Sequence, residues 1–407
     1  MTDFDCAVIG GGMVGAASAL SLAEQGLTVA LIEMYQPKVF ASEQALDLRV
    51  SAISLASQFL LEQLGAWQHI KQWRACPYER LGVWEQEFAY TEFNAEDIEQ
   101  PHLGHIVENR LIQLALWQQI KSHNNIKIFC PESLTNLEQD MDKVTLTLSQ
   151  QTLSAKLLIA ADGANSQVRQ LTNIGVTSWD YQQSAMLINV ETVCEQQDIT
   201  WQQFFPTGPV AFLPLSRKPL TEQGRFKQKE GVGYASLVWY HHRDEIKRLS
   251  GLSNSQLQQE VMANFPKRLG HITVVDKAAF PLTRRHANNY QKGRVLLVGD
   301  AAHTINPMAG QGVNLGFKDV KALQEVIALA IAEGKCWHDE KVLSQYERLR
   351  RRDNLLMQST MDALYLSFSH PSSVIKAMRN LSLFAINKLP LVNTLVKNKA
   401  LKYACGI

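Results

Sequence analysis

The chain contains 407 residues, of which 46% are apolar, and carries a formal net charge of +1. This length allows two or three domains with a sizeable core, and the near-neutral charge argues against nucleic acid as the principal partner. No run of about 18 apolar residues is present, and Asp3 and Asp5 stand where a secretory signal would be positive, so we expect a cytoplasmic protein. The six cysteines are scattered without metal-ligand spacing, so we expect reduced, core-filling thiols and no metal site.

The first predicted element is an apolar strand over residues 5–9, followed by a glycine-rich turn and a helix over 16–25. In the turn, Gly10 permits the tight bend, Gly12 lets the backbone approach a pyrophosphate, and Gly15 allows close packing of helix and strand. A second strand over 28–32 ends in an acid near the usual ribose-binding distance of about 20 residues. The sequence therefore predicts a dinucleotide site. Its residues are Gly10, Gly11, Gly12, Met13, Val14, Gly15 and Glu33.

The middle of the chain alternates between helical and strand-like patterns. We expect helices over 54–65, 109–121 and 255–265, and strands over 80–93, 144–148 and 153–159. The last of these strands leads into Asp162 and Gly163, which alone would be an ordinary turn. From residue 186 to 240 the apolar period approaches two, which predicts an antiparallel sheet that could wall a substrate chamber.

A third motif follows the apolar run 294–298 and precedes a long helical pattern. An aspartate at the end of a buried strand can accept hydrogen bonds from a polyol, while a helix start presents free N–H groups. Both needs belong to a riboflavin-type cofactor, so we expect Asp300 to anchor a ribityl chain and the following loop to lie against the isoalloxazine ring. The loop residues in this prediction are Gly310, Gln311, Gly312, Val313 and Asn314.

The order and spacing of these three motifs resemble those of the class A flavoprotein monooxygenases, the para-hydroxybenzoate hydroxylase family. Segments 162–170, 211–215, 280–286 and 303–307 look like the ubiquinone-biosynthesis hydroxylases of that family. The resemblance implies an α/β (α+β) fold in which a Rossmann-type FAD-binding domain is interleaved with an antiparallel-sheet substrate domain. We assign 1–75, 105–180 and 280–335 to the first domain, 76–104 and 181–279 to the second, and 336–407 to a C-terminal helical segment.

The resemblance also implies individual contacts. Arg49 would point toward the nucleotide part of FAD, Asp162 belongs to the Asp-Gly motif, and Pro307 would lie near the reactive edge of the flavin, although it could simply stiffen the loop. Asn109 stands where many relatives have an arginine. A histidine at a helix start is more often a structural hydrogen-bond partner than an acid or base, so we assign His303 no catalytic role.

The implied reaction is hydroxylation of a polyprenylated phenol or benzoquinol ring. NAD(P)H reduces FAD, O₂ adds at the C4a carbon to give a hydroperoxyflavin, and the distal oxygen passes to the ring, so water exclusion matters more than charged catalysts. Only one G-x-G-x-x-G motif is present, so NAD(P)H should bind transiently. No catalytic side chain is named. Aromatic and polar residues on the strands are candidates for the chamber wall, although such aromatics are often plain core: Phe212, Pro214, Trp239 and His286.

The tail from residue 371 to 407 has six basic residues and no acid, with apolar residues at helical spacing. It could hold the protein at the anionic inner face of the cytoplasmic membrane, or pack on the core with its charges solvated. Two other functions stay open, a flavin-dependent polyprenyl reductase and a non-catalytic lipid-handling escort protein. The sequence also leaves open association into a homo-oligomer or a ubiquinone-biosynthesis complex.

Overall fold

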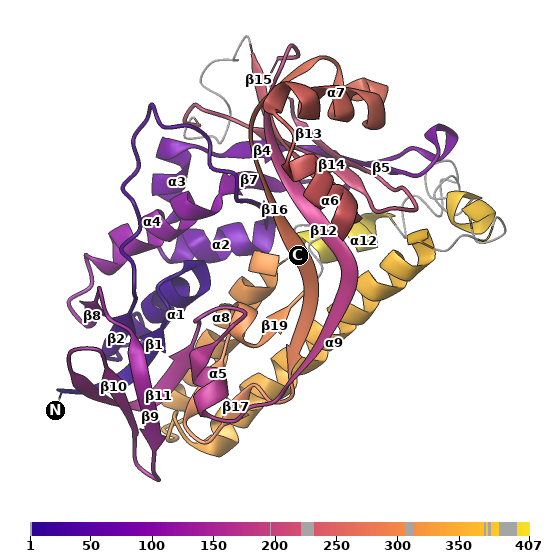
Figure 1. The fold of residues 1–407 in the computed structure, drawn as a ribbon. Coiled ribbons are helices and arrows are strands. Elements are labelled where there is room, and N and C mark those ends of the chain that lie inside the picture. Colours follow the sequence, from indigo (N-terminus) through magenta and orange to yellow (C-terminus); the bar gives the residue numbers. More distant parts are fainter. Residues whose placement is uncertain are drawn as a thin grey trace.

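The structure of the protein, a computed structural model, describes residues 2–195, 197–220, 232–305, 312–369, 372, 376–381 and 397–407. Two eight-stranded sheets and one three-stranded sheet organise this part of the chain. Figure 1 shows how they are arranged. Helices cover the first large sheet and one face of the second. This mixed architecture is the fold class expected from the sequence.

The first large sheet has a parallel centre, as the β-α-β pattern predicted. Its strands lie in the order β17 (Gln291–Lys292), β18 (Val295–Leu297), β11 (Thr152–Ala160), β1 (Thr2–Ile9), β2 (Val29–Ile32) and β8 (Ile126–Phe129). The antiparallel strands β9 (Leu134–Gln139) and β10 (Val144–Leu148) extend it from β11. Helix α1 (Met13–Ala23) packs against α4 (Asn109–Ile120) and α8 (Gly312–Ala332). Because β2 is buried along its whole length, it is an uninterrupted apolar run.

The second large sheet is mostly antiparallel. Its order is β19 (His303–Thr304), β16 (Ile272–Ala287), β12 (Val176–Thr192), β15 (Gly233–His242), β14 (Val210–Leu215), β13 (Ile199–Gln203), β5 (Arg80–Trp84) and β6 (Thr91–Asn94). Within the described part of this sheet, only the β13–β5 pair is parallel. Helices α6 (Arg243–Ser250) and α7 (Asn254–Asn264) cover one face over a core that contains Trp84, Trp201 and Phe212. The other face is free to border a site.

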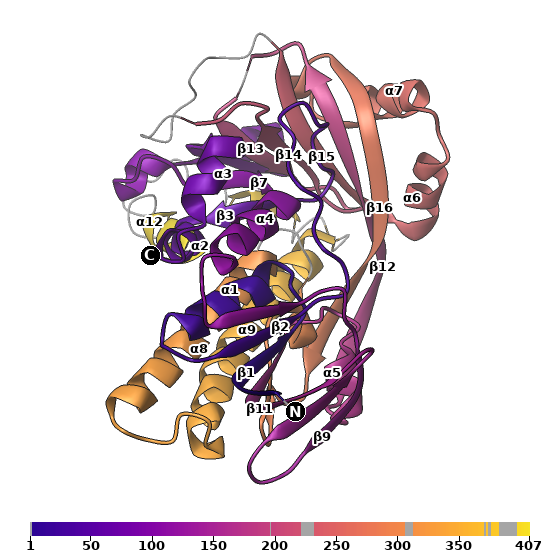
Figure 2. The same cartoon turned by 90° about the vertical axis from the view of Figure 1, so that its left-hand side faces the viewer.

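The two long strands β12 and β16 extend from the second large sheet toward the region of the first large sheet, as Figure 2 shows. Between the large sheets lies the sheet β3 (Val50–Ser54), β7 (Gly104–Glu108) and β4 (Cys76–Tyr78), with α2 (Leu55–Gln63) and α3 (Trp67–Trp73) beside it. The short helix α5 (Gln167–Leu171) follows β11. Strands β5 and β6 pair with the second sheet, which supports our division into interleaved domains. We keep the boundaries as a proposal, because β12 and β16 cross them.

The C-terminal part is helical where the structure describes it. Helix α9 (Glu340–Ser369) packs along α8, and α12 (Asn398–Cys405) packs near α2 and the short 3-10 helix η2 (Ala95–Ile98). In Figure 1, α9 runs along one side of the molecule. Among the described residues, no helix has both the length and the apolar character needed to cross a bilayer.

Candidate active site

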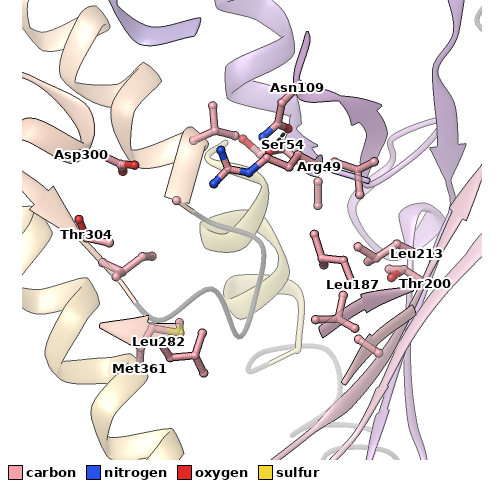
Figure 3. Close-up of a pocket in the computed structure, with 18 of the residues that line it drawn as sticks. Arg49, Ser54, Asn109, Leu187, Thr200, Leu213, Leu282, Asp300, Thr304 and Met361 are labelled. Atoms are coloured by element: carbon pink, nitrogen blue, oxygen red, sulfur yellow. Dashed lines mark hydrogen bonds between the residues drawn. The ribbon is translucent and has the colours of Figure 1, made fainter. Parts of the chain in front are cut away.

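A cavity of about 750 Å³ is bordered by both large sheets. One wall comes from the turn after β1, the turn after β11 and the 3-10 helix η4 (Gly299–Ala301), and the opposite wall is the uncovered face of the second sheet. Figure 3 shows Asp300 and Thr304 on the first side, and Leu187 and Leu213 on the second. The predicted cofactor and substrate regions therefore share one continuous space.

The glycines of the first turn are required for different reasons. A Cβ atom at Gly15 would lie 1.9 Å from the carbonyl oxygen of Gly10, and one at Gly10, whose φ is +102°, would lie 2.5 Å from that of Ala161. A Cβ atom at Gly12 would meet nothing within 4 Å. No side chain caps α1, which begins just after Gly12. Free N–H groups and open space therefore coincide where a pyrophosphate would bind.

The backbone of the same turn is fixed by hydrogen bonds to the Glu33 carboxylate and the Trp117 indole. The N–H group of Gly11 donates to Glu33 at 2.5 Å, and its carbonyl accepts from the Trp117 indole at 2.8 Å. The other Glu33 oxygen accepts the N–H of Tyr35 at 3.0 Å. Glu33 thus lies at the predicted end of β2 and stabilises the turn, while Met13 and Val14 line the cavity.

The Asp-Gly motif forms a second turn beside the first. One Asp162 oxygen accepts the N–H of Val168 at 3.1 Å, while its Oδ1 atom is buried and has no partner in the described part of the chain. The Arg169 guanidinium donates to the carbonyls of Ala164 and Ala301, at 2.9 and 2.8 Å. This arginine ties the Asp-Gly turn to η4.

Asp300 follows β18 and lines the cavity. Its side chain is exposed to the space of the cavity, although the residues on either side of it in the turn are buried. Burial raises the pKa of Asp300, and the nearby His303 and Arg49 act in the opposite direction. Figure 3 shows Arg49, just before β3, projecting into the space that faces Asp300. Beside it, Asn109 accepts a hydrogen bond from the Ser51 hydroxyl at 2.7 Å. A negative acceptor and a cation thus border the cofactor side.

Sequence reasoning missed Asp319, the fully buried acid behind this turn. Its carboxylate accepts from the Gly299 N–H at 2.9 Å, from the Arg350 guanidinium at 2.7 Å and contacts the His303 ring at 2.6 Å. Burial alone would raise the pKa of Asp319, but His303 and Arg350 outweigh it and hold the pKa at about 2. Asp319 is an acid on the apolar face of helix 312–332, and this position in the sequence pattern could have identified it. His303 is thus a structural partner, as expected.

These features fit a flavin dinucleotide. Gly12 leaves a cradle that any Cβ atom would begin to fill, Asp162 keeps a buried oxygen without a partner, and Asp300 offers a carboxylate to the cavity. A pyrophosphate needs the open cradle at Gly12, and the polyol chain of a flavin needs a carboxylate acceptor such as Asp300. The individual contacts remain proposals.

The loop before α8 is described only in part. Pro307, Gly310 and Gln311 lie outside the described residues. Gly312 and Val313 line the cavity at the start of α8.

Asn314 has a structural role that its place in the motif did not indicate. Its Oδ1 atom accepts the Ser54 N–H at 3.1 Å and the Ser57 hydroxyl at 2.7 Å, and its Nδ2 atom donates to the carbonyl of Ala52 at 2.8 Å. The side chain therefore ties α8 to β3 and α2, so we propose that Asn314 positions the loop rather than using its amide on the cofactor.

The alternation of the sheet assigns the chamber wall to residues other than those predicted. Phe212 stacks on Trp201 with ring centroids 5.4 Å apart, and Trp239 packs on Phe265, both in the core under α6 and α7. Pro214 has the same parity on β14 as Phe212. The neighbours of opposite parity line the cavity, namely Ala211, Leu213, Val238 and Tyr240. The prediction thus placed the aromatic residues on the wrong face, because period two does not reveal which face is covered.

His286 is buried on β16, beside Tyr290, at a centroid distance of 5.4 Å. It pairs in register with His303 and does not appear among the described residues that line the cavity. Burial lowers the pKa of His286 to about 4. It is therefore neutral at physiological pH and belongs to the packing behind the flavin-side turn.

The C-terminal segment forms a third wall of the cavity, which the sequence did not predict. Leu401, Ala404 and Cys405 of α12 line it. Earlier in the same segment, a buried Arg379–Glu85 ion pair of 2.6 Å fixes residues 376–381 to the end of β5. The described parts of the tail therefore pack on the core, as one of our two alternatives predicted, although Arg379 and Lys397 lie in buried ion pairs rather than in solvent.

Comparisons with known proteins agree with this geometry. The profile of the family described as "FAD binding domain" matches residues 3–358. The chain is 45% identical over 404 residues to the Escherichia coli 3-demethoxyubiquinol 3-hydroxylase, covering 99% of this chain and 98% of that protein. It is 32% identical to the Danio rerio mitochondrial ubiquinone biosynthesis monooxygenase COQ6, over 95% and 87% of the two chains.

Among solved structures, the p-nitrophenol 4-monooxygenase PnpA from Pseudomonas putida matches with a TM-score of 0.77. The match covers 100% of this chain and 99% of that one at 20% identity. The probable FAD-dependent monooxygenase pqsL from Pseudomonas aeruginosa matches with a TM-score of 0.74 at 19% identity, over 94% and 100% of the two chains. At these identities, the likeness concerns the fold alone.

Proposed function

The chain belongs to the FAD-binding monooxygenase family, and on that premise we propose that it hydroxylates the ring of a polyprenylated benzoquinol in ubiquinone biosynthesis, with NAD(P)H and O₂ as co-substrates. The 45% identity to the Escherichia coli 3-demethoxyubiquinol 3-hydroxylase favours the demethoxy compound. The observation that carries the proposal is the single cavity that joins the dinucleotide turn to an apolar sheet face.

The chain's own residues would bind and orient the cofactor. The N–H groups at the start of α1 would hold the pyrophosphate, Asp300 would accept hydrogen bonds from the ribityl chain, and Arg49 would offer its charge to the nucleotide part. Bound FAD supplies electron transfer from NAD(P)H and activation of O₂. We name no acid or base.

Exclusion of water is the part of the reaction that the chamber would perform. The sheet side of the cavity is lined mainly by aliphatic residues from five strands, among them Leu187, Ala211, Leu213 and Val238. An apolar wall favours a substrate with a hydrocarbon tail and disfavours water near the reacting ring. This supports oxygen transfer over its wasteful alternative, the release of hydrogen peroxide.

The test uses the purified, FAD-loaded protein and a short-chain demethoxy benzoquinol. We expect substrate-dependent NAD(P)H oxidation that is matched by O₂ uptake and by a product one oxygen heavier in mass spectrometry. NAD(P)H oxidation without O₂ uptake would indicate the reductase instead. A colourless protein that binds no flavin would indicate the lipid-handling escort. Deletion of the gene in a ubiquinone-making host should cause the demethoxy precursor to accumulate.

We also propose that the protein meets its substrate at an anionic membrane surface. Lys399 and Lys402 on α12 are exposed, whereas Lys397 and Arg379 are buried in ion pairs and are not available. Leu381, which adjoins the Arg379 ion pair, is 65% exposed. Each exposed cation near such a surface can contribute about 1 kcal/mol.

Co-sedimentation with anionic and neutral vesicles tests this attachment. Replacing both Lys399 and Lys402 with glutamate should reduce binding to the anionic vesicles about tenfold or more, because two attractive charges become repulsive. Lys247→Glu on α6 is the control, since Figure 2 shows α6 and α12 on opposite sides of the molecule. Equal binding of all forms would contradict the proposal. A tail truncation is a poorer test, because it removes the α12 wall of the cavity.

A further inference from the structure

Two long polar side chains, Tyr240 and Gln202, lie on the sheet face of the cavity. Tyr240 on β15 lies among Ala211, Val238 and Leu282 and is only 4% exposed. Its hydroxyl has no hydrogen bond to any residue in the described part of the chain, although it lines the cavity. Burial raises the pKa of Tyr240, so the hydroxyl stays protonated and can donate. A buried hydroxyl normally has a partner, because leaving it unpaired is costly.

Gln202 on β13 is the second such group. It pairs in register with Ala211, which places its amide on the cavity face. Its neighbours on the strand are satisfied by protein, since the Thr200 hydroxyl donates to the carbonyl of Phe212 at 2.8 Å and the Gln203 amide donates to that of Glu85 at 3.4 Å. Within the described residues the Gln202 amide has no such partner. On β13, therefore, Thr200 and Gln203 bond to the protein backbone, and the Gln202 amide is left to bond a ligand in the cavity.

Register places the two groups on either side of a small residue. Gln202 lies opposite Ala211, Ala211 lies opposite Val238, and Tyr240 is two residues beyond Val238 on the same face. Two strand spacings of about 4.8 Å and an offset of about 6.8 Å put their backbone positions about 12 Å apart. A single ring can bridge this span, because a hydrogen bond at each edge adds about 2.8 Å. The short Ala211 side chain leaves room between them.

Several other polar residues of the lining are already assigned, whereas Tyr78, Thr283 and Thr304 line the cavity from other strands, β4, β16 and β19. Ser51 and Asn109 bond to each other, Thr200 is bonded to the backbone, and Arg49 and Asp300 lie on the cofactor side. We propose that Gln202 and Tyr240 determine substrate specificity by binding two oxygen substituents of the ring, with Tyr240 as a donor and the Gln202 amide as donor or acceptor. This inference rests on the proposed hydroxylase function and adds the residues that recognise the substrate.

The test measures binding to the FAD-loaded protein without NAD(P)H, from the change in flavin absorbance. The probe is a methoxylated benzoquinol with a decyl chain under anaerobic conditions, compared with a ring that carries the same decyl chain but no oxygen substituents. Tyr240→Phe and Gln202→Leu should each weaken binding of the quinol about two- to tenfold, which is the loss of one neutral hydrogen bond. Tyr240→Phe should have a smaller effect on the ring without oxygen substituents, which offers its hydroxyl no acceptor.

Tyr234→Phe is the matched control, because Tyr234 lies on the same strand and its hydroxyl accepts from Arg217 at 3.4 Å outside the cavity lining described. It should leave binding unchanged. Equal losses for the quinol and for the ring without oxygen substituents in both variants, or no loss at all, would overturn the inference while leaving the hydroxylase proposal intact. A wild-type protein that neither binds nor hydroxylates the quinol would instead refute the proposed function itself.

Discussion

The dinucleotide turn and the sheet wall border the same cavity but constrain their residues differently. At the turn, backbone atoms approach so closely that Gly10 and Gly15 admit no side chain. On the sheet wall, a position is defined only by the face it occupies, so Leu213 faces the cavity and its neighbour Phe212 faces the core. Local backbone geometry therefore specifies residue identity at the first site, whereas the covering helices decide the role of each residue at the second.

The largest effect we expect comes from a side chain at Gly15. Gly15→Val would force a Cβ atom to within 1.9 Å of the Gly10 carbonyl oxygen, so the first β-α unit could not form as it does. We expect insoluble protein or loss of the cooperative unfolding transition. Gly12→Ala is the control in the same turn, since its Cβ atom meets nothing within 4 Å. It should unfold like wild type without cofactor, yet retain less FAD. Similar behaviour of the two variants would contradict the different roles of these glycines.

The next largest effect concerns the buried acid behind η4. Asp319→Asn leaves the Arg350 cation without its buried partner, which should lower the free energy of unfolding by about 3–5 kcal/mol. Asp353→Asn is the control, because Asp353 also bonds Arg350 but is partly exposed and should matter much less. Denaturant unfolding measures both. Similar losses in the two variants would show that burial of Asp319 is not decisive.

The same acid predicts a pH dependence. The pKa of Asp319 is held at about 2 in the folded protein, below the ordinary value of about 4, so folding favours its ionised form. The stability it contributes is present above pH 4 and is lost as the pH falls from about 4 to about 2. The wild type should lose more stability over this interval than Asp319→Asn. Parallel pH profiles would contradict the assignment.

Adjacent residues on β14 give the next contrast. Phe212→Ala removes a buried ring that stacks on Trp201, so we expect the free energy of unfolding to fall by about 3–5 kcal/mol. Leu213→Ala enlarges the cavity and should mainly weaken quinol binding, with a smaller loss of stability because this side chain is only partly buried. Chemical denaturation and flavin-perturbation titration separate the two results. Loss of quinol binding in Phe212→Ala at unchanged stability would reverse the assigned faces.

This contrast explains what the sequence could predict. Gly12, Asp162 and Asp300 belong to motifs in which short chain segments fix the geometry, so the cofactor side and the fold class could be predicted. The covered face of β14 depends on α6 and α7, which follow it in the chain, so alternation alone could not distinguish Phe212 from Leu213. The α12 wall depends on contacts between residues about 300 positions apart, such as that of Cys405 with Leu103, which no local pattern encodes.

Asp300 gives the smallest effect that we predict, and it tests the cofactor side directly. Asp300→Ala should weaken FAD binding about ten- to a hundredfold, because hydrogen bonds to a charged acceptor contribute about 1.5–3 kcal/mol. Since burial raises the pKa of Asp300 in the free protein, its ionised fraction, and with it FAD affinity, should fall at mildly acidic pH. Asp300→Asn keeps an acceptor but no titration, so its affinity should not follow that change. Full FAD occupancy in Asp300→Ala would remove the ribityl anchor from this site.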